Sequence, residues 1–160
     1  MISTDLATAV AHLLHQALFG AVAAGGFGVL FNFGRRCLVW AVGFGAVALT
    51  VRTLALDAHW SLEAASFAAA FVTGALALVF RDRLGAAMET IALAGCIPMI
   101  PGAFFANALL GFFALTAPEV PELQATVFQS LQAFLRVIFT LGAIGAGLAV
   151  PAHLWRFGRH

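Results

Sequence analysis

Five long apolar runs set the main constraint on how this chain can fold. They cover residues 7–31, 37–56, 62–80, 85–115 and 125–152, and only short connections separate them. About 20 apolar residues of helix cross a bilayer, and each run approaches or exceeds that length. Only 9% of the residues are charged, which is too few to cover a water-soluble globule. The sequence therefore predicts an all-α integral membrane protein, with residues 1–160 forming one transmembrane domain of five helices.

The arginines predict how these helices are oriented. Three pairs follow the first, third and fifth runs, namely Arg35 and Arg36, Arg81 and Arg83, and Arg156 and Arg159. The other two connections contain acidic residues, such as Glu119, and no arginine. The positive-inside rule then places the N-terminus outside and the C-terminus in the cytoplasm. The fourth run crosses the membrane once in this topology, and we expect a multi-pass protein of a bacterial inner membrane.

The fourth run is interrupted near its middle by the segment IPMIPG, which contains Pro98, Pro101 and Gly102. Proline removes a backbone donor and clashes with the carbonyl four residues earlier, so the sequence predicts a helix broken at Ile97–Gly102. The second half-helix would begin with unpaired N–H groups and a positive dipole end, which transporters direct at anionic substrate groups. The structural alternative is a proline kink whose backbone groups are satisfied by a neighbouring helix.

Several polar residues within the runs are candidates for a substrate path. Counting about 1.5 Å per residue places Arg136 near mid-membrane, at the depth of the break. A charge there is costly, so Arg136 is either an anion contact or part of a structural ion pair. Asn107 can bond to a substrate or to another helix. Glu89 either relays protons or balances Arg83, and Arg52 near the outer loop either pairs with an acid or extends to the surface.

Other features exclude function classes. The chain has no lysine and no hydrolase, protease or redox motif, so we expect no enzyme activity and no cofactor. The scattered basic residues do not form a nucleic-acid surface. His12 and His15 share one helical face, but two histidines alone do not predict a metal site. Glycine-rich helical faces favour close packing, including packing against further copies or other chains in a higher oligomer.

Four segments, in this order and spacing, resemble a known family: GFGVLFNFGRR, HWSLEAASFAAAFVTG, CIPMIPGAFF and GLAVPAHLW. The chain is similar, over about residues 26–155, to the small five-span subunit type of the threonine/serine exporter family. Positions that match the family pattern are Asn32, Arg52, Trp60, Ser61, Ser66, Gly74, Pro98, Pro101 and Gly102. The substrate path implied by the residues and this resemblance together comprises Pro98, Pro101, Gly102, Asn107, Arg136, Arg52, Asn32 and Ser66. Arg136 and Glu89 have no clear counterpart, so Arg136 is either structural or a determinant of selectivity.

The resemblance also implies a mode of action. A small subunit of this type works with a larger membrane subunit that has five spans of its own and an extra N-terminal domain. Members export threonine and serine, or dicarboxylates such as succinate, with the proton gradient as the implied energy source. We therefore expect an exporter subunit for a small carboxylate metabolite, whose contacts are this substrate, the larger subunit and the lipid bilayer. The alternatives are a channel-like homo-oligomer and a non-transporting membrane scaffold.

Overall fold

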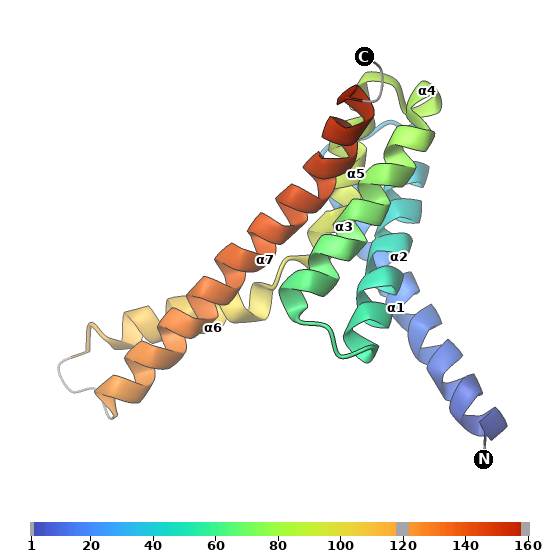
Figure 1. The fold of residues 1–160 in the computed structure, drawn as a ribbon. Coiled ribbons are helices and arrows are strands. Elements are labelled where there is room, and N and C mark those ends of the chain that lie inside the picture. The colour runs from blue at the N-terminus through green and yellow to red at the C-terminus, as the bar shows by residue number, and fades with distance from the viewer. Residues whose placement is uncertain (1, 118–121, 158–160) are drawn as a thin grey trace. The chain divides into compact units, whose positions relative to one another are not determined.

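The computed structural model describes residues 2–117 and 122–157, and every element in these residues is a helix or a helical turn (Figure 1). Glu119 and Arg159, which contribute to the predicted orientation, lie outside the described residues, and the orientation stays a prediction. The elements in chain order are α1 (Ile2–Leu30), α2 (Arg35–Asp57), α3 (Leu62–Val79), α4 (Arg81–Leu84), η1 (Gly85–Ala87), α5 (Met88–Cys96), η2 (Ile97–Met99), α6 (Gly102–Ala114) and α7 (Leu123–Phe157).

Four of these helices contain segments that are long and apolar enough to cross a bilayer, namely Ala7–Leu30, Arg35–Asp57, Leu62–Val79 and Leu123–Trp155. A fifth candidate is a bent pair, Met88–Met99 with Gly102–Ala114, which is either one broken span or a re-entrant loop. The prediction of an all-helical membrane chain with an interrupted fourth segment is therefore confirmed. Its break is a short 3-10 turn followed by residues 100 and 101, where the backbone leaves the helix.

The chain divides into two compact units. The larger unit comprises residues 1–99 and 143–160, and the smaller unit comprises residues 100–142. The smaller unit therefore holds α6 and the first part of α7, whereas the larger unit holds α1 to α5 and the remainder of α7.

Two turns in the larger unit use residues in the left-handed backbone region. Asn32 after α1 has φ 56°, and His59 after α2 has φ 62°. At the first turn, Asn32 N–H donates to the carbonyl of Val29 and Phe33 N–H donates to that of Gly28. This pair of bonds is a Schellman motif, which satisfies the carbonyls that a helix end leaves unpaired. Asparagine tolerates the left-handed conformation better than most residues, which explains why a helix can end at this position.

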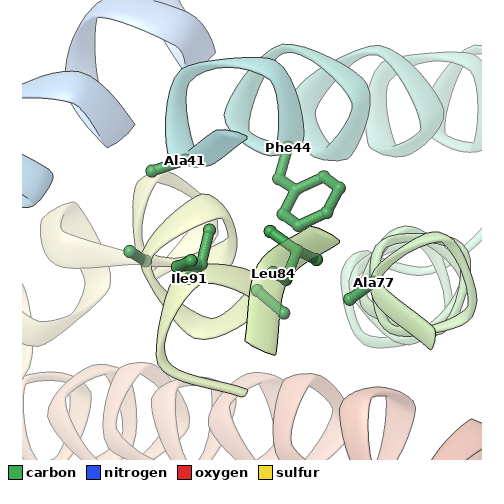
Figure 2. Close-up of a cluster of buried hydrophobic side chains, with 7 residues drawn as sticks. Ala41, Phe44, Ala77, Leu84 and Ile91 are labelled. Carbon is green, nitrogen blue, oxygen red and sulfur yellow. The ribbon is translucent and has the colours of Figure 1, made fainter. Parts of the chain in front are cut away.

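The larger unit packs through small residues. Its fully buried positions include Ala41, Ala48 and Ala65, and the backbones of α1 and α2 approach each other where Gly20 faces Gly45. Larger side chains fill one cluster between α2, α3 and α5. Figure 2 shows the Phe44 ring pointing from α2 into this space, where Leu84 also lies. Small residues at such contacts let membrane helices approach closely, so dispersion contacts replace a hydrophobic effect that lipid does not supply.

Candidate functional site

The smaller unit contains an open pocket between α6 and α7 with a volume of about 570 Å³. Its lining residues from α6 are Phe104, Asn107, Leu110 and Gly111, and those from α7 are Thr126, Gln129, Ser130, Gln132, Ala133 and Arg136. At about 3.6 residues per turn, the positions of each set fall within one half of the helix circumference, so each set lies on one helical face. Two predicted site residues, Asn107 and Arg136, are thus brought to one pocket from different helices.

Arg136 contributes the positive charge of this pocket. Its Cζ atom lies 5.1 Å from the centroid of the Phe104 ring, which is a cation–π distance. The Phe104 ring therefore lies next to the guanidinium within the pocket lining. The N–H groups of a guanidinium lie in its plane, where they can meet a carboxylate with two parallel hydrogen bonds. The geometry therefore supplies a cation on the side of an otherwise neutral pocket.

Amides and hydroxyls make up the other polar groups of the pocket. Asn107, Gln129 and Gln132 each offer both N–H donors and a carbonyl acceptor. Ser130 donates its hydroxyl hydrogen to the carbonyl of Thr126 at 2.6 Å, and the oxygen keeps its acceptor capacity. No described residue that lines the pocket is acidic. Such a surface suits a small anion or zwitterion that carries hydrogen-bonding groups, because its charged described residue is a cation and its other described polar residues are neutral.

At the break, the backbone finds partial replacements for its lost helical bonds. Gly102 N–H donates to the carbonyl of Ile100 at 2.8 Å, and Phe105 N–H donates to that of Pro101 at 3.1 Å. Within the larger unit, Arg52 Nη1 donates to the carbonyl of Met99 at 2.8 Å. Arg52 therefore contacts the last residue of the 3-10 turn within the break.

Three other predicted residues, Asn32, Ser66 and Glu89, belong to the larger unit. Asn32 is exposed and closes the turn after α1. Ser66 is fully buried in α3, and its hydroxyl donates to the carbonyl of Leu62 at 2.7 Å. Glu89 lines a second pocket of about 320 Å³ in the larger unit, together with His153 of α7. The predicted path residues are thus distributed over both units, and Asn107 and Arg136 are the two of them that line the polar pocket.

Sequence reasoning missed part of the polar pocket. Thr126, Gln129, Ser130 and Gln132 precede Arg136 in the segment LQATVFQSLQAFLR, and their spacing places them on its side of the helix. This polar stripe in an apolar run was the available signal. By contrast, no local sequence pattern predicts that Arg52 donates to the backbone carbonyl of Met99, 47 residues further along the chain.

Metal ligands do not gather in the described part of the chain. No group of three or more histidine, cysteine, aspartate or glutamate residues there is arranged to hold a metal ion. His12 instead lies 3.5 Å from the Gln16 amide, and the His15 ring packs edge-on against Phe19 at 4.6 Å between centroids.

Comparison with known proteins identifies the family. The family model described as "Threonine/Serine exporter, ThrE" matches residues 16–154, which is most of the chain. The chain belongs to the threonine/serine exporter family. It is also 32% identical, over 143 residues, to an uncharacterized protein of Haemophilus influenzae, and the match covers 89% of this chain and 48% of that relative. This exporter-family chain therefore spans about half the length of the relative, and no solved structure matches it significantly.

Proposed function

We propose that this chain is one membrane component of a secondary exporter for small carboxylate metabolites, with the polar pocket of the smaller unit as its substrate site. The observation that carries the proposal is the lining of that pocket, in which one arginine and three amide side chains occur without an acid. Membership of the exporter family and the apolar helices support transport across a membrane rather than an enzymatic reaction.

The composition of the pocket favours threonine or serine over a dicarboxylate. A single guanidinium matches the single carboxylate of either amino acid. The carbonyl oxygens of Asn107, Gln129 and Gln132 can accept hydrogen bonds from the substrate ammonium and hydroxyl groups. A dicarboxylate such as succinate would place its second carboxylate against neutral amides, without a second cation from this lining. Succinate is therefore the alternative substrate that the experiment must include.

A larger membrane subunit of the same family is the proposed partner. The Haemophilus influenzae relative is about twice as long as the matched region, so its remaining half has room for a second membrane unit. We extend this two-part plan to the present chain, with the N-terminus outside and the C-terminus in the cytoplasm of a bacterial inner membrane. In this scheme Glu89 relays protons in the pocket that it shares with His153. The break at Pro98, Pro101 and Gly102 belongs to the substrate path, together with Arg52.

The test is export from cells or vesicles that contain the full chain with and without a candidate larger subunit. We expect coupled efflux of L-threonine or L-serine that requires both chains. Efflux from this chain alone, independent of any gradient, would instead indicate a channel-like homo-oligomer. Partner capture without efflux of threonine, serine or succinate would indicate a scaffold and would overturn the proposal.

Substitutions on α7 connect the result to the pocket. Arg136→Gln should lower threonine efflux at least about tenfold, since a hydrogen bond to a charged group contributes about 1.5–3 kcal/mol. Gln129→Leu should lower it about two- to tenfold, since a neutral hydrogen bond contributes about 0.5–1.5 kcal/mol. Gln124→Leu is the matched control, because Gln124 is an exposed glutamine on the same helix and does not line the pocket. Equal efflux from all three variants at equal protein level would remove this pocket from the mechanism.

A further inference from the structure

Arg52 is a cation within α2, a candidate membrane span, and its side chain is only partly satisfied. The guanidinium is half-buried, and Nη1 donates to the Met99 carbonyl at 2.8 Å. Its Nε atom is buried and has no hydrogen-bond partner. Among the described residues, no carboxylate lies within ion-pair distance of this side chain. A charge in such a position marks a place where an anion or polar ligand is needed, because an uncompensated cation in a membrane span is costly.

The acceptor that Arg52 uses is a structural feature of the break. Met99 is the last residue before the chain leaves the helix, and it is fully buried. A carbonyl at a helix end lacks the partner that the next helical turn would supply. Arg52 provides this partner from α2 and so connects α2 to the end of the helix before the break. The contact is a bond between a cation and a neutral acceptor, and no carboxylate among residues 2–117 and 122–157 supplies a counter-ion.

We propose that Arg52 binds the carboxylate of the transported substrate at the break, at a different stage of transport from binding in the polar pocket, and releases the Met99 carbonyl as it does so. This inference rests on the proposed function, because the carboxylate belongs to the exported metabolite. A carboxylate is a stronger acceptor for a guanidinium than a neutral carbonyl, and it can take two N–H groups at once. A buried Nε without a hydrogen bond costs free energy. A ligand that accepts a hydrogen bond from Arg52 Nε recovers that free energy on binding.

The exchange would couple substrate binding to movement of the break. With Arg52 on Met99, the carbonyl at the end of the first half-helix is held against α2. With Arg52 on a carboxylate, that carbonyl loses its partner and the turn at residues 97–99 becomes easier to rearrange. The substrate shifts the equilibrium because it interacts differently with the two arrangements, which is the requirement for a ligand-driven change. Arg52 then has two roles: it binds the substrate, and without substrate its hydrogen bond to Met99 holds the turn at residues 97–99 in place. We call this second role the latch.

Cys96 is a built-in reporter for this exchange, since it is fully buried and lies three residues before Met99. The experiment measures N-ethylmaleimide labelling of Cys96 in membrane vesicles that contain the full chain with Cys37→Ser together with a candidate larger subunit. L-Threonine should accelerate labelling at least about threefold. L-Threoninamide, which lacks the carboxylate, should leave the labelling rate unchanged. Equal acceleration by threonine and threoninamide, or no acceleration by either threonine or succinate, would overturn the inference without the need for any Arg52 variant.

Variants of Arg52 then separate its two contacts. Arg52→Gln should label at least about threefold faster than the wild-type residue without threonine, and threonine should add nothing. Arg52→Lys retains a donor for the Met99 carbonyl but lacks the planar fork, so it should label slowly and respond weakly. Arg35→Gln is the control at the exposed start of the same helix and should behave as the parent chain. An Arg52→Gln chain that labels and responds like its parent would contradict the latch.

Efflux measured on the same vesicles distinguishes this inference from the proposed function. If threonine is exported while Cys96 labelling ignores it, the role of Arg52 is wrong and the exporter proposal stands. If succinate accelerates labelling and threonine does not, the role of Arg52 stands and the choice of substrate is wrong.

Discussion

The close approach of α1 and α2 gives the sharpest stability prediction. A Cβ atom at Gly45 would meet the carbonyl oxygen of Gly20, would lie 3.0 Å from the Gly20 carbonyl carbon, and would also meet the Ala24 Cβ. Backbone atoms cannot rotate away as a side chain can, so Gly45→Ala must push the two helices apart. Gly43 lies two residues earlier on α2, and a Cβ there would meet nothing within 4 Å. Gly43→Ala and Gly45→Ala both lie in α2, so comparing them isolates the effect of the close contact between α1 and α2.

The magnitude follows from two opposing effects. Replacing glycine by alanine in a helix interior stabilises by about 1 kcal/mol through helix propensity, and both variants gain this amount. Overpacking at Gly45 costs about 1–3 kcal/mol, and Gly43→Ala avoids that cost. The free energies of unfolding of the two variants should thus differ by about 1–3 kcal/mol. At about 2–4 °C per kcal/mol for a chain of this size, the melting temperatures should differ by about 2–12 °C.

The assay is thermal unfolding of the detergent-solubilised chain, followed by helical circular dichroism. Gly43→Ala should melt at or above the parent temperature, and Gly45→Ala should melt clearly below Gly43→Ala. Gly20→Ala should show the same defect. Gly20→Ala and Gly45→Ala should also combine non-additively, because both substitutions open the same contact. Indistinguishable melting of the Gly43 and Gly45 variants would refute the close backbone approach.

Three further predictions concern the turn after α1, the break and the pocket. Asn32→Ala should lower the stability by about 1 kcal/mol because alanine resists a positive φ, whereas Asn32→Gly should be neutral or stabilising in the same melting assay. Alanine at both Pro98 and Pro101 should restore a continuous helix and abolish threonine efflux at unchanged protein level; full efflux would exclude the break from transport. Gly111→Ala would place a Cβ against the Ser130 hydroxyl, so it should reduce efflux, while Gly142→Ala on open helix surface should not.

Local sequence features were sufficient to predict the helices and the break. Apolar run length determines which segments can cross a bilayer, and proline acts on its own turn of helix, so both signals are read without tertiary information. The same reasoning identified Asn107 and Arg136 as candidate residues. It did not predict that they share a pocket, because that depends on how α6 and α7 pair within the smaller unit.

Long-range contacts were the part that the sequence did not predict. Arg52 was expected either to pair with an acid or to extend to the surface, because its neighbours in sequence suggest nothing else. The structure instead directs it to Met99, an acceptor that exists only because a helix ends there. When a side chain donates to a backbone carbonyl, the acceptor residue cannot be identified from its amino-acid type, since every residue has a carbonyl. Such contacts require the fold to be known.

The buried serine and threonine hydroxyls are satisfied within their own helices and so give no information about a ligand. Ser66, Thr73 and Thr140 are fully buried, and each donates to the carbonyl four residues earlier in its own helix. Their hydroxyl hydrogens are satisfied locally, so burial of these side chains needs no substrate to explain it. A guanidinium has five donors and a charge, which no single carbonyl can satisfy. Arg52 and Arg136 are therefore better probes of the proposed substrate than the buried hydroxyls, because a guanidinium prefers a carboxylate to a neutral acceptor.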